Sequence, residues 1–161
     1  MRYLAIDLGD KRTGLALGDR ETGLISPLEV LECAISADEG RLLLTRLHAA
    51  ITTHLGTGKG TLVIGLPLNM DGSEGPQAKK TRAFGALLAG ATKRPVVFHD
   101  ERLTSADADW SMARSGMTRD QKKHKRDALA AAAILRDYFG SLEGDLGSSG
   151  AGSDGESPSS D

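Results

Sequence analysis

Three short apolar stretches open the chain, and only turn residues separate them. Residues 3–8, 12–18 and 24–33 each have the length and the apolar content of a strand. Gly9 and Asp10 form a turn signal between the first two stretches. Such short connections favour antiparallel neighbours, so the first third of the chain is predicted to be an antiparallel meander.

Helices and strands alternate in the remainder of the chain. Apolar residues at helical spacing indicate helices, and short apolar runs bounded by Gly or Pro indicate buried strands. The expected elements are, in order, a helix at 38–54, a strand at 61–65, a helix after the loop 66–73, a strand at 96–99, a helix from Thr104 and a last helix from about Thr118 to Phe139. This pattern predicts an α/β fold with a mixed five-stranded sheet, an antiparallel meander plus parallel strands, flanked by helices.

The composition changes at Gly140. Residues 140–161 carry five acidic residues and no Lys or Arg, and they are rich in Gly and Ser. So few apolar residues cannot bury enough surface to offset the entropy of ordering, and we therefore predict a disordered acidic tail. The folded domain is expected at 1–139, where 20 basic and 17 acidic residues give a mildly basic charge. This charge is compatible with a nucleic-acid partner.

The cellular compartment is constrained by one cysteine and by the lack of long apolar runs. Cys33 cannot form an intramolecular disulfide, which suits a reducing compartment, and its apolar neighbours predict a buried side chain. Charged residues follow the first apolar stretch too soon for a signal peptide. No apolar run approaches the ~20 residues that span a bilayer. We therefore expect a cytoplasmic protein that does not associate with membranes.

Three acidic residues fall where a fold of this kind would bring them together. Asp7 lies at the end of the first strand, and Glu101 lies just past the strand at 96–99. Ligands gather at the carboxyl ends of parallel strands in open sheets, so these two carboxylates are expected to be close if their strands are parallel neighbours. Asp127 lies on the apolar stripe of the last helix and should face inward. An inward-facing acid is costly unless it is paired or metal-bound.

Carboxylates in this arrangement suit phosphodiester hydrolysis. Two metal ions can activate a water molecule and neutralise the charge that develops on the leaving oxygen. Oxygen ligands favour Mg²⁺ or Mn²⁺, and no Cys or His spacing indicates zinc. The alternative is that Asp7 forms a turn and that Glu101 pairs with Arg102 or Arg12.

Four sequence blocks resemble the YqgF family, RNase H-like pre-16S rRNA nucleases that are also described as Holliday-junction-resolvase-like. The blocks are Ala5–Gly9 with Lys11–Ala16, Gly65–Gly75, Asp100–Ser105, and Asp127–Ala131 followed by Ile134 and Leu135. They occur in the family's order and cover residues 3 to 139. Asp10 stands where the family has a small residue, often Thr, and the acidic tail is outside the family pattern.

The resemblance implies an RNase H-like fold and a role in maturing the 5′ end of small-subunit (16S) ribosomal RNA. It also implies that Asp7, Glu101 and Asp127 are the catalytic carboxylates, and that they hold Mg²⁺ or Mn²⁺, with two ions expected. The expected partners are precursor rRNA or branched DNA, and ribosomal particles.

Basic residues crowd the start of the last helix, where cations oppose the helix dipole. Binding a phosphate backbone beside the active carboxylates would explain the placement of Lys122, Lys123, Lys125 and Arg126. A merely solvated helix face is the alternative. We also assign Lys11, Arg12 and Asn69 to substrate binding.

Three further residues have two readings each. Ser73 either contacts a phosphate or, as we expect, caps the second helix. His99 either carries a proton or, as we expect, is a structural strand histidine. Trp110 either stacks on a base or packs within the protein.

Other functions remain open at this point. A Holliday-junction resolvase would have the same fold and metals, and a non-catalytic binding module would keep the fold alone. An Asp-Leu-Gly turn also opens the ATP-binding fold of sugar kinases, but those proteins need two such lobes. The sequence is compatible with a monomer or a homodimer.

Overall fold

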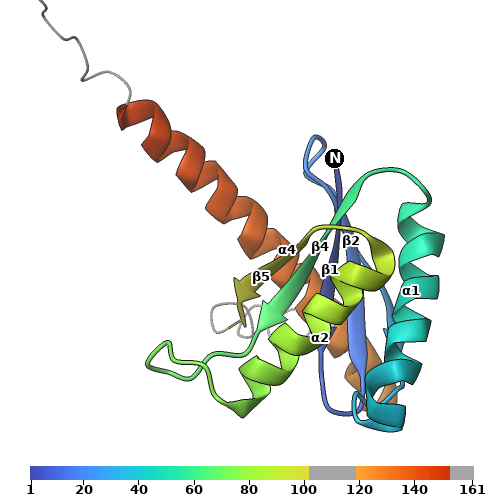
Figure 1. Ribbon diagram of the computed structural model, residues 1–161. Coiled ribbons are helices and arrows are strands. Elements are labelled where there is room, and N and C mark those ends of the chain that lie inside the picture. The colour runs from blue at the N-terminus through green and yellow to red at the C-terminus, as the bar shows by residue number, and fades with distance from the viewer. Residues whose placement is uncertain (102–118, 153–161) are drawn as a thin grey trace, which may run out of the picture.

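The structure is a computed structural model that describes residues 1–101 and 119–152, including the side chains of residues 126–143 in the last helix. The helix and strand order is shown in Figure 1. The elements are β1 (Arg2–Leu8), β2 (Thr13–Asp19), β3 (Ile25–Leu31), η1 (Ala37–Gly40), α1 (Arg41–Leu55), β4 (Gly60–Leu66), α2 (Pro76–Thr92), β5 (Val96–Asp100) and α4 (Arg119–Gly152).

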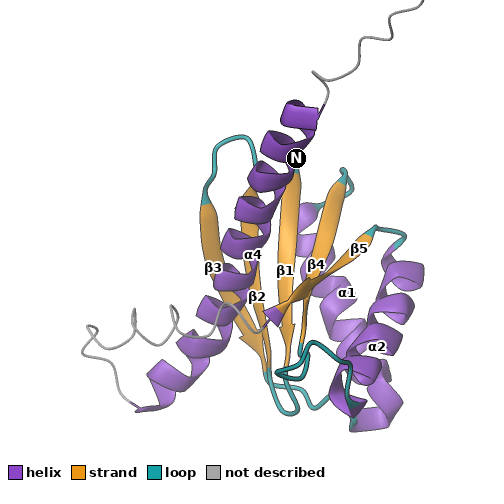
Figure 2. Ribbon diagram, turned by 90° about the vertical axis from the view of Figure 1, so that its left-hand side faces the viewer, coloured by secondary structure: helices purple, strands orange, loops and turns teal. Residues whose placement is uncertain are grey.

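The strands form one five-stranded sheet in the order β3-β2-β1-β4-β5. β1 pairs antiparallel with β2, and β2 pairs antiparallel with β3. β4 is parallel to both β1 and β5. The predicted mixed sheet, an antiparallel meander followed by parallel strands, is therefore confirmed, with β1 at its centre (Figure 2).

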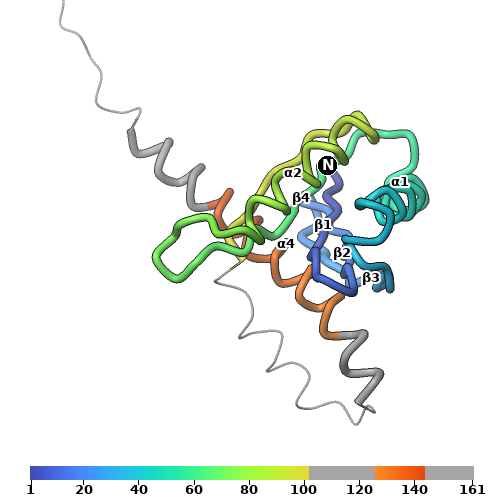
Figure 3. The backbone as a smooth tube through the Cα atoms, turned by 60° about the horizontal axis from the view of Figure 1, so that its bottom comes forward, coloured from blue at the N-terminus to red at the C-terminus, as the bar shows by residue number. Residues whose placement is uncertain are grey.

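Helices cover both faces of this sheet. α1 and α2 lie on one face and α4 crosses the other, as the turned view along the sheet shows (Figure 3). Alternation along β1 sends Leu4 and Ile6 into the core beneath α1 and α2. Tyr3 and Ala5 point into the second core, beneath α4. Asp7 continues this second set and therefore faces α4.

Small residues bring α4 close to the sheet. Ala131, Ala132 and Ala133 are buried on the helix. A Cβ on Gly18 of β2 would stand 2.6 Å from Leu135 of α4, so no larger residue fits there without a shift. The small side chains of the Ala-rich run thus allow α4 to approach the sheet closely.

Two helix starts differ from the sequence prediction. The first helix was expected from Asp38, but Asp38 and Glu39 have positive φ angles of 51° and 57°, and α1 begins at Arg41. Consecutive left-handed residues cannot continue a right-handed helix. The second helix begins at Pro76 rather than at Ser73, because a proline suits a first helical position.

The last helix is longer than expected. Its predicted end at Phe139 is wrong, since α4 continues to Gly152 and its far end projects away from the sheet (Figure 1). Residues 140–152 keep the helical backbone pattern despite their polar composition. The tail's independence from the folded domain stays a prediction. Thr104, Trp110 and Thr118 lie outside the described residues.

Candidate active site

Asp7 ends β1 on the face that α4 covers. It pairs with Gly14 of β2, which has no side chain and so leaves room above the sheet. On its other side, Ile6 pairs with Ile64, which brings Asp7 next to the end of β4. The carboxylate is therefore at the carboxyl end of the central strand, where ligands gather in open α/β sheets.

Glu101 reaches the same place across β4. The two carboxylates were expected to be close on the condition that their strands are parallel neighbours, but β4 separates β1 from β5. The two carboxyl groups still meet because β4 carries a glycine at the crossing. A Cβ on Gly65 would stand 3.4 Å from the Glu101 carboxyl carbon, so the Glu101 side chain lies over the bare backbone of Gly65.

The two acids interact directly. Burial raises the pKa of Asp7 well above its usual value, and a side-chain hydrogen bond with Glu101 and the charge of Glu101 raise it further. Two carboxyl groups in contact cannot both ionise without cost, because their charges repel. The pair therefore favours a bound proton or a bound cation.

Asp127 approaches from α4. A Cβ on Gly14 would collide with the Asp127 backbone carbonyl, so the helix lies directly on the strand residue that pairs with Asp7. The Asp127 side chain is partly buried. Within the described part of the chain, no three Asp, Glu, His or Cys side chains gather closely enough to hold a metal ion. The structure thus pairs Asp7 with Glu101 and places Asp127 on the helix above, and metal binding by all three stays a prediction.

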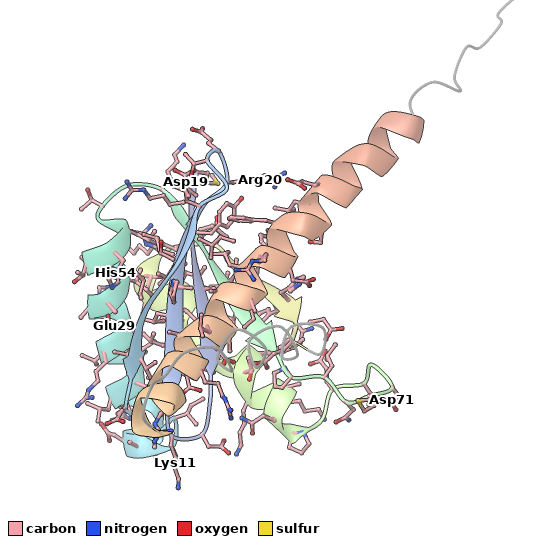
Figure 4. All side chains as sticks on the ribbon, turned by 180° about the vertical axis from the view of Figure 1, so that it is seen from behind. Lys11, Asp19, Arg20, Glu29, His54 and Asp71 are labelled. Carbon is pink, nitrogen blue, oxygen red and sulfur yellow. The ribbon has the colours of Figure 1, made fainter. Side chains whose placement is uncertain are left out.

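Lys11 and Arg12 differ in their surroundings. Lys11 is exposed in the turn after β1, at the end of the sheet opposite Asp19 and Arg20 (Figure 4). Arg12 is half-buried, and its Nε lies 3.6 Å from Glu32 Oε1. Lys11 is therefore the better placed of the two to meet a substrate at the Asp7 end of the sheet.

The loop between β4 and α2 has its own polar network. Asn69 Nδ2 donates to Ser73 Oγ at 3.0 Å, and the Ser73 hydroxyl donates to Asp71 Oδ1 at 2.6 Å. The Ser73 backbone N–H donates to the same Asp71 oxygen, and the helix cap position is Gly75, so the expected cap at Ser73 is wrong. Asn69 shapes this loop, and its contact with a substrate stays a prediction. Met70 at the loop is 93% exposed.

The basic cluster lies at the start of α4. Lys122, Lys123 and Lys125 belong to the first two turns of the helix, and their side chains are outside the described set. Arg126 is exposed and is next to Asp127 in the chain. The backbone therefore brings the cluster to the turns that immediately precede Asp127.

Two features of the site were not predicted from the sequence. Gly14 and Gly65 create the space in which the acids meet, and an isolated glycine in a strand does indicate a close approach of another group. The second feature is a bond between His99 Nε2 and Asp137 Oδ2, at 2.5 Å. His99 is thus a bonded strand histidine, as expected, but nothing in the sequence pointed to Asp137 as its partner.

A mixed five-stranded sheet in this strand order, flanked by helices and with acidic side chains at the ends of its parallel strands, is an RNase H-like fold. The family model described as RuvX, Holliday junction resolvase, matches residues 1–141. The chain belongs to this family, and the prediction of a nuclease is confirmed.

Relatives and solved structures agree with this assignment. A protein of Anaeromyxobacter sp. (strain Fw109-5) is 40% identical over 86% of this chain and 96% of its own, and one of Geobacillus kaustophilus (strain HTA426) is 38% identical over 88% and 99%. Both are named as candidate pre-16S rRNA nucleases.

Two solved structures show the same fold at low sequence identity. RuvC of T. thermophilus in complex with a Holliday junction substrate has a TM-score of 0.52 at 16% identity, covering 89% of this chain and 96% of that chain. The fowlpox virus Holliday junction resolvase has a TM-score of 0.54 at 12% identity, covering 88% and 100%. Within the described residues, no helix is long and apolar enough to cross a membrane.

Proposed function

We propose that this protein is a divalent-metal-dependent endonuclease that cleaves precursor small-subunit (16S) ribosomal RNA during maturation of its 5′ end, in the cytoplasm. The observation that carries the proposal is the contact between the Asp7 and Glu101 carboxyl groups at the carboxyl end of the parallel strands. The names of the relatives support the choice of substrate.

The donor groups fit a hard divalent cation. Asp7 and Glu101 supply carboxylate oxygens, which Mg²⁺ and Mn²⁺ prefer. Their mutual repulsion in a partly buried place is relieved by a cation as well as by a proton. Asp7 and Glu101 would hold the ion, and Asp127 would join them from α4. When bound, two ions would supply charge neutralisation and an activated water.

Residues around the acids would position the RNA. Lys11 is exposed at the Asp7 end of the sheet, and the basic first turns of α4 precede Asp127. Cations in these places can hold phosphates on either side of the cleaved bond. Such contacts fix the position of the backbone without reading its sequence.

A cleavage assay with two substrates tests the proposal. The purified chain is incubated with a labelled precursor fragment that spans the 5′ end of 16S rRNA and, separately, with a four-way DNA junction. Each reaction is run with Mg²⁺, with Mn²⁺ and with chelator, and Glu101→Gln is the matched inactive control. We expect metal-dependent cutting of the RNA at discrete positions.

The other outcomes identify the alternatives. Cutting of the junction with intact RNA would make the chain a DNA resolvase, a reading that the family description and the RuvC-like fold keep open. A resolvase nicks two strands symmetrically, so light scattering should then show a dimer. No cutting of either substrate, together with no Mn²⁺-dependent rise in melting temperature, would make the chain a non-catalytic binding module.

A further inference from the structure

His99 joins the edge strand of the sheet to the helix that crosses it. Its Nε2 lies 2.5 Å from Asp137 Oδ2 of α4, and its side chain is only 15% exposed. The imidazole also packs edge-on against Tyr138, with ring centroids 5.7 Å apart. The ring is therefore fixed by two neighbouring residues of α4.

This contact lies beside the Glu101 carboxyl group. His99 pairs with Gly65 of β4, the glycine over which Glu101 lies. A Cβ on Gly65 would also stand 2.6 Å from Ile134 Cδ1, so α4 is in contact with the sheet at the same point. Ile134 and Asp137 are one helical turn apart and lie on neighbouring parts of one face of α4. The same turn of α4 thus lies near the Glu101 side chain at Gly65 and contacts His99, which is two residues before Glu101 in the chain.

The strand that carries Glu101 needs such a support. β5 is the five-residue edge strand, with β4 as its neighbour in the sheet. An edge strand lacks the second hydrogen-bonded neighbour that holds a central strand such as β1. Glu101 follows the last residue of β5, so any displacement of the strand end moves its carboxyl group. A 1 Å displacement of a catalytic group can cost about 10²-fold in rate.

We propose that His99 and Asp137 form a clamp that holds the end of β5 against α4 and so positions Glu101 beside Asp7. The two residues are positioning residues for the cleavage reaction, and in this respect the inference rests on the proposed function. The clamp also links the elements that carry two of the acids, since Glu101 follows β5 and Asp127 belongs to α4. A contact that fixes the strand end from which Glu101 extends thereby limits the positions that its carboxyl group can take.

Four variants separate the clamp from simple packing. His99→Leu removes the N–H donor and Asp137→Ala removes the acceptor, whereas His99→Gln keeps an N–H donor. Arg136→Gln is the control, because Arg136 is exposed on the same helix turn. We expect His99→Leu and Asp137→Ala to lower kcat by roughly 10- to 100-fold, because a displacement of about 1 Å at the Glu101 carboxyl group can have an effect of this size. KM should stay within about twofold, because the phosphate contacts remain.

The pattern across variants is as informative as the size of the loss. His99→Gln should recover part of the lost kcat, and the double variant His99→Leu/Asp137→Ala should be no worse than the poorer single variant. Equal losses in His99→Gln and His99→Leu, or losses that add in the double variant, would overturn the clamp in favour of independent packing effects. Wild-type kcat in both single variants would overturn it as well.

Two readouts without cleavage keep this test separate from the test of the function. Calorimetric Mn²⁺ titration should show weaker binding in His99→Leu and Asp137→Ala, with Arg136→Gln unchanged. Amide hydrogen exchange in the metal-free protein should be faster at residues 98–101 in the same two variants. An inactive wild type would refute the proposed function alone, since exchange still decides the clamp. Unchanged exchange at 98–101 would overturn the clamp whatever the activity.

Discussion

The backbone carbonyl of Asp127 lies directly over Gly14, the residue that pairs with Asp7 across the β1–β2 ladder. The α4 residue that we propose as a catalytic acid is thus brought to the site by a close backbone approach of its helix to β2. The contact is possible only because position 14 has no Cβ. The distance between α4 and β2 at Gly14 therefore determines how much space the site has between the helix and the sheet.

Gly14→Ala should therefore be destabilising and inactivating. The new methyl group meets backbone atoms, which cannot move away by a rotamer change, and overpacking of this kind costs about 2–3 kcal/mol, or roughly 5–10 °C in Tm. Gly58→Ala is the matched control, because a Cβ at Gly58 meets no heavy atom within 4 Å. Thermal melts and cleavage rates of both variants check the prediction. Equal Tm values would mean that α4 is not seated on β2 at this position.

The acids should limit stability when no metal is bound. Because the folded-state pKa of Asp7 is raised, the folded protein holds that proton more tightly than the unfolded chain, and the free energy of unfolding falls as the pH rises above 3.8. Asp7→Asn removes this loss, so the metal-free variant should melt no lower than wild type, and its relative Tm should improve from pH 4 to pH 8. Glu143→Gln, an exposed position on α4, is the control. A variant that melts lower at pH 8 would contradict the repulsion between Asp7 and Glu101.

Much of the site was predictable because it depends on strand ends and helix periodicity. Asp7 lies near the end of the first apolar strand, Glu101 directly follows the strand at 96–99, and Asp127 lies on the apolar stripe of the last helix. Periodicity locates such residues without knowledge of the strand order. The order itself is a tertiary property, and so the insertion of β4 between β1 and β5 was not anticipated.

The features that sequence reasoning missed depend on contacts between distant segments. Nothing near Asp137 in the sequence shows that it faces a histidine 38 residues earlier. The start of α1 was also mispredicted. Acidic residues such as Asp38 and Glu39 are typical of a helix start. Both residues instead have left-handed backbone angles, and the chain turns there before α1 begins.

The basic cluster should control how substrate binding depends on salt. Replacing Lys122, Lys123, Lys125 and Arg126 with Gln should lower the slope of log K against log salt by roughly 3 units if all four contact phosphates, since each contributes about 0.7–0.9. Mn²⁺ affinity should be nearly unchanged, because the carboxylates remain. Fluorescence anisotropy with labelled RNA from 50 to 300 mM salt measures the slope. An unchanged slope would place the RNA elsewhere on the surface.

The acidic tail should be dispensable for folding. The aromatic residues that pack α4 against its core end with Tyr138 and Phe139, so deleting residues 140–161 should alter neither Tm nor the metal dependence of cleavage. Calorimetry of the truncated and full chains checks this. A loss of several degrees would show that the helix beyond Phe139 contributes to the fold.

We propose that Asp7, Glu101 and Asp127 act together in a metal-dependent cleavage. Single-turnover cleavage of the precursor 16S rRNA fragment with Mg²⁺ tests it most directly, comparing wild type with Asp7→Asn, Glu101→Gln and Asp127→Asn at equal folded concentration. We expect chelator to stop cleavage by the wild type, and we expect each variant to lose cleavage while it still binds the RNA and melts no lower in chelator. Full activity in any one variant, or wild-type cleavage in chelator, would contradict it.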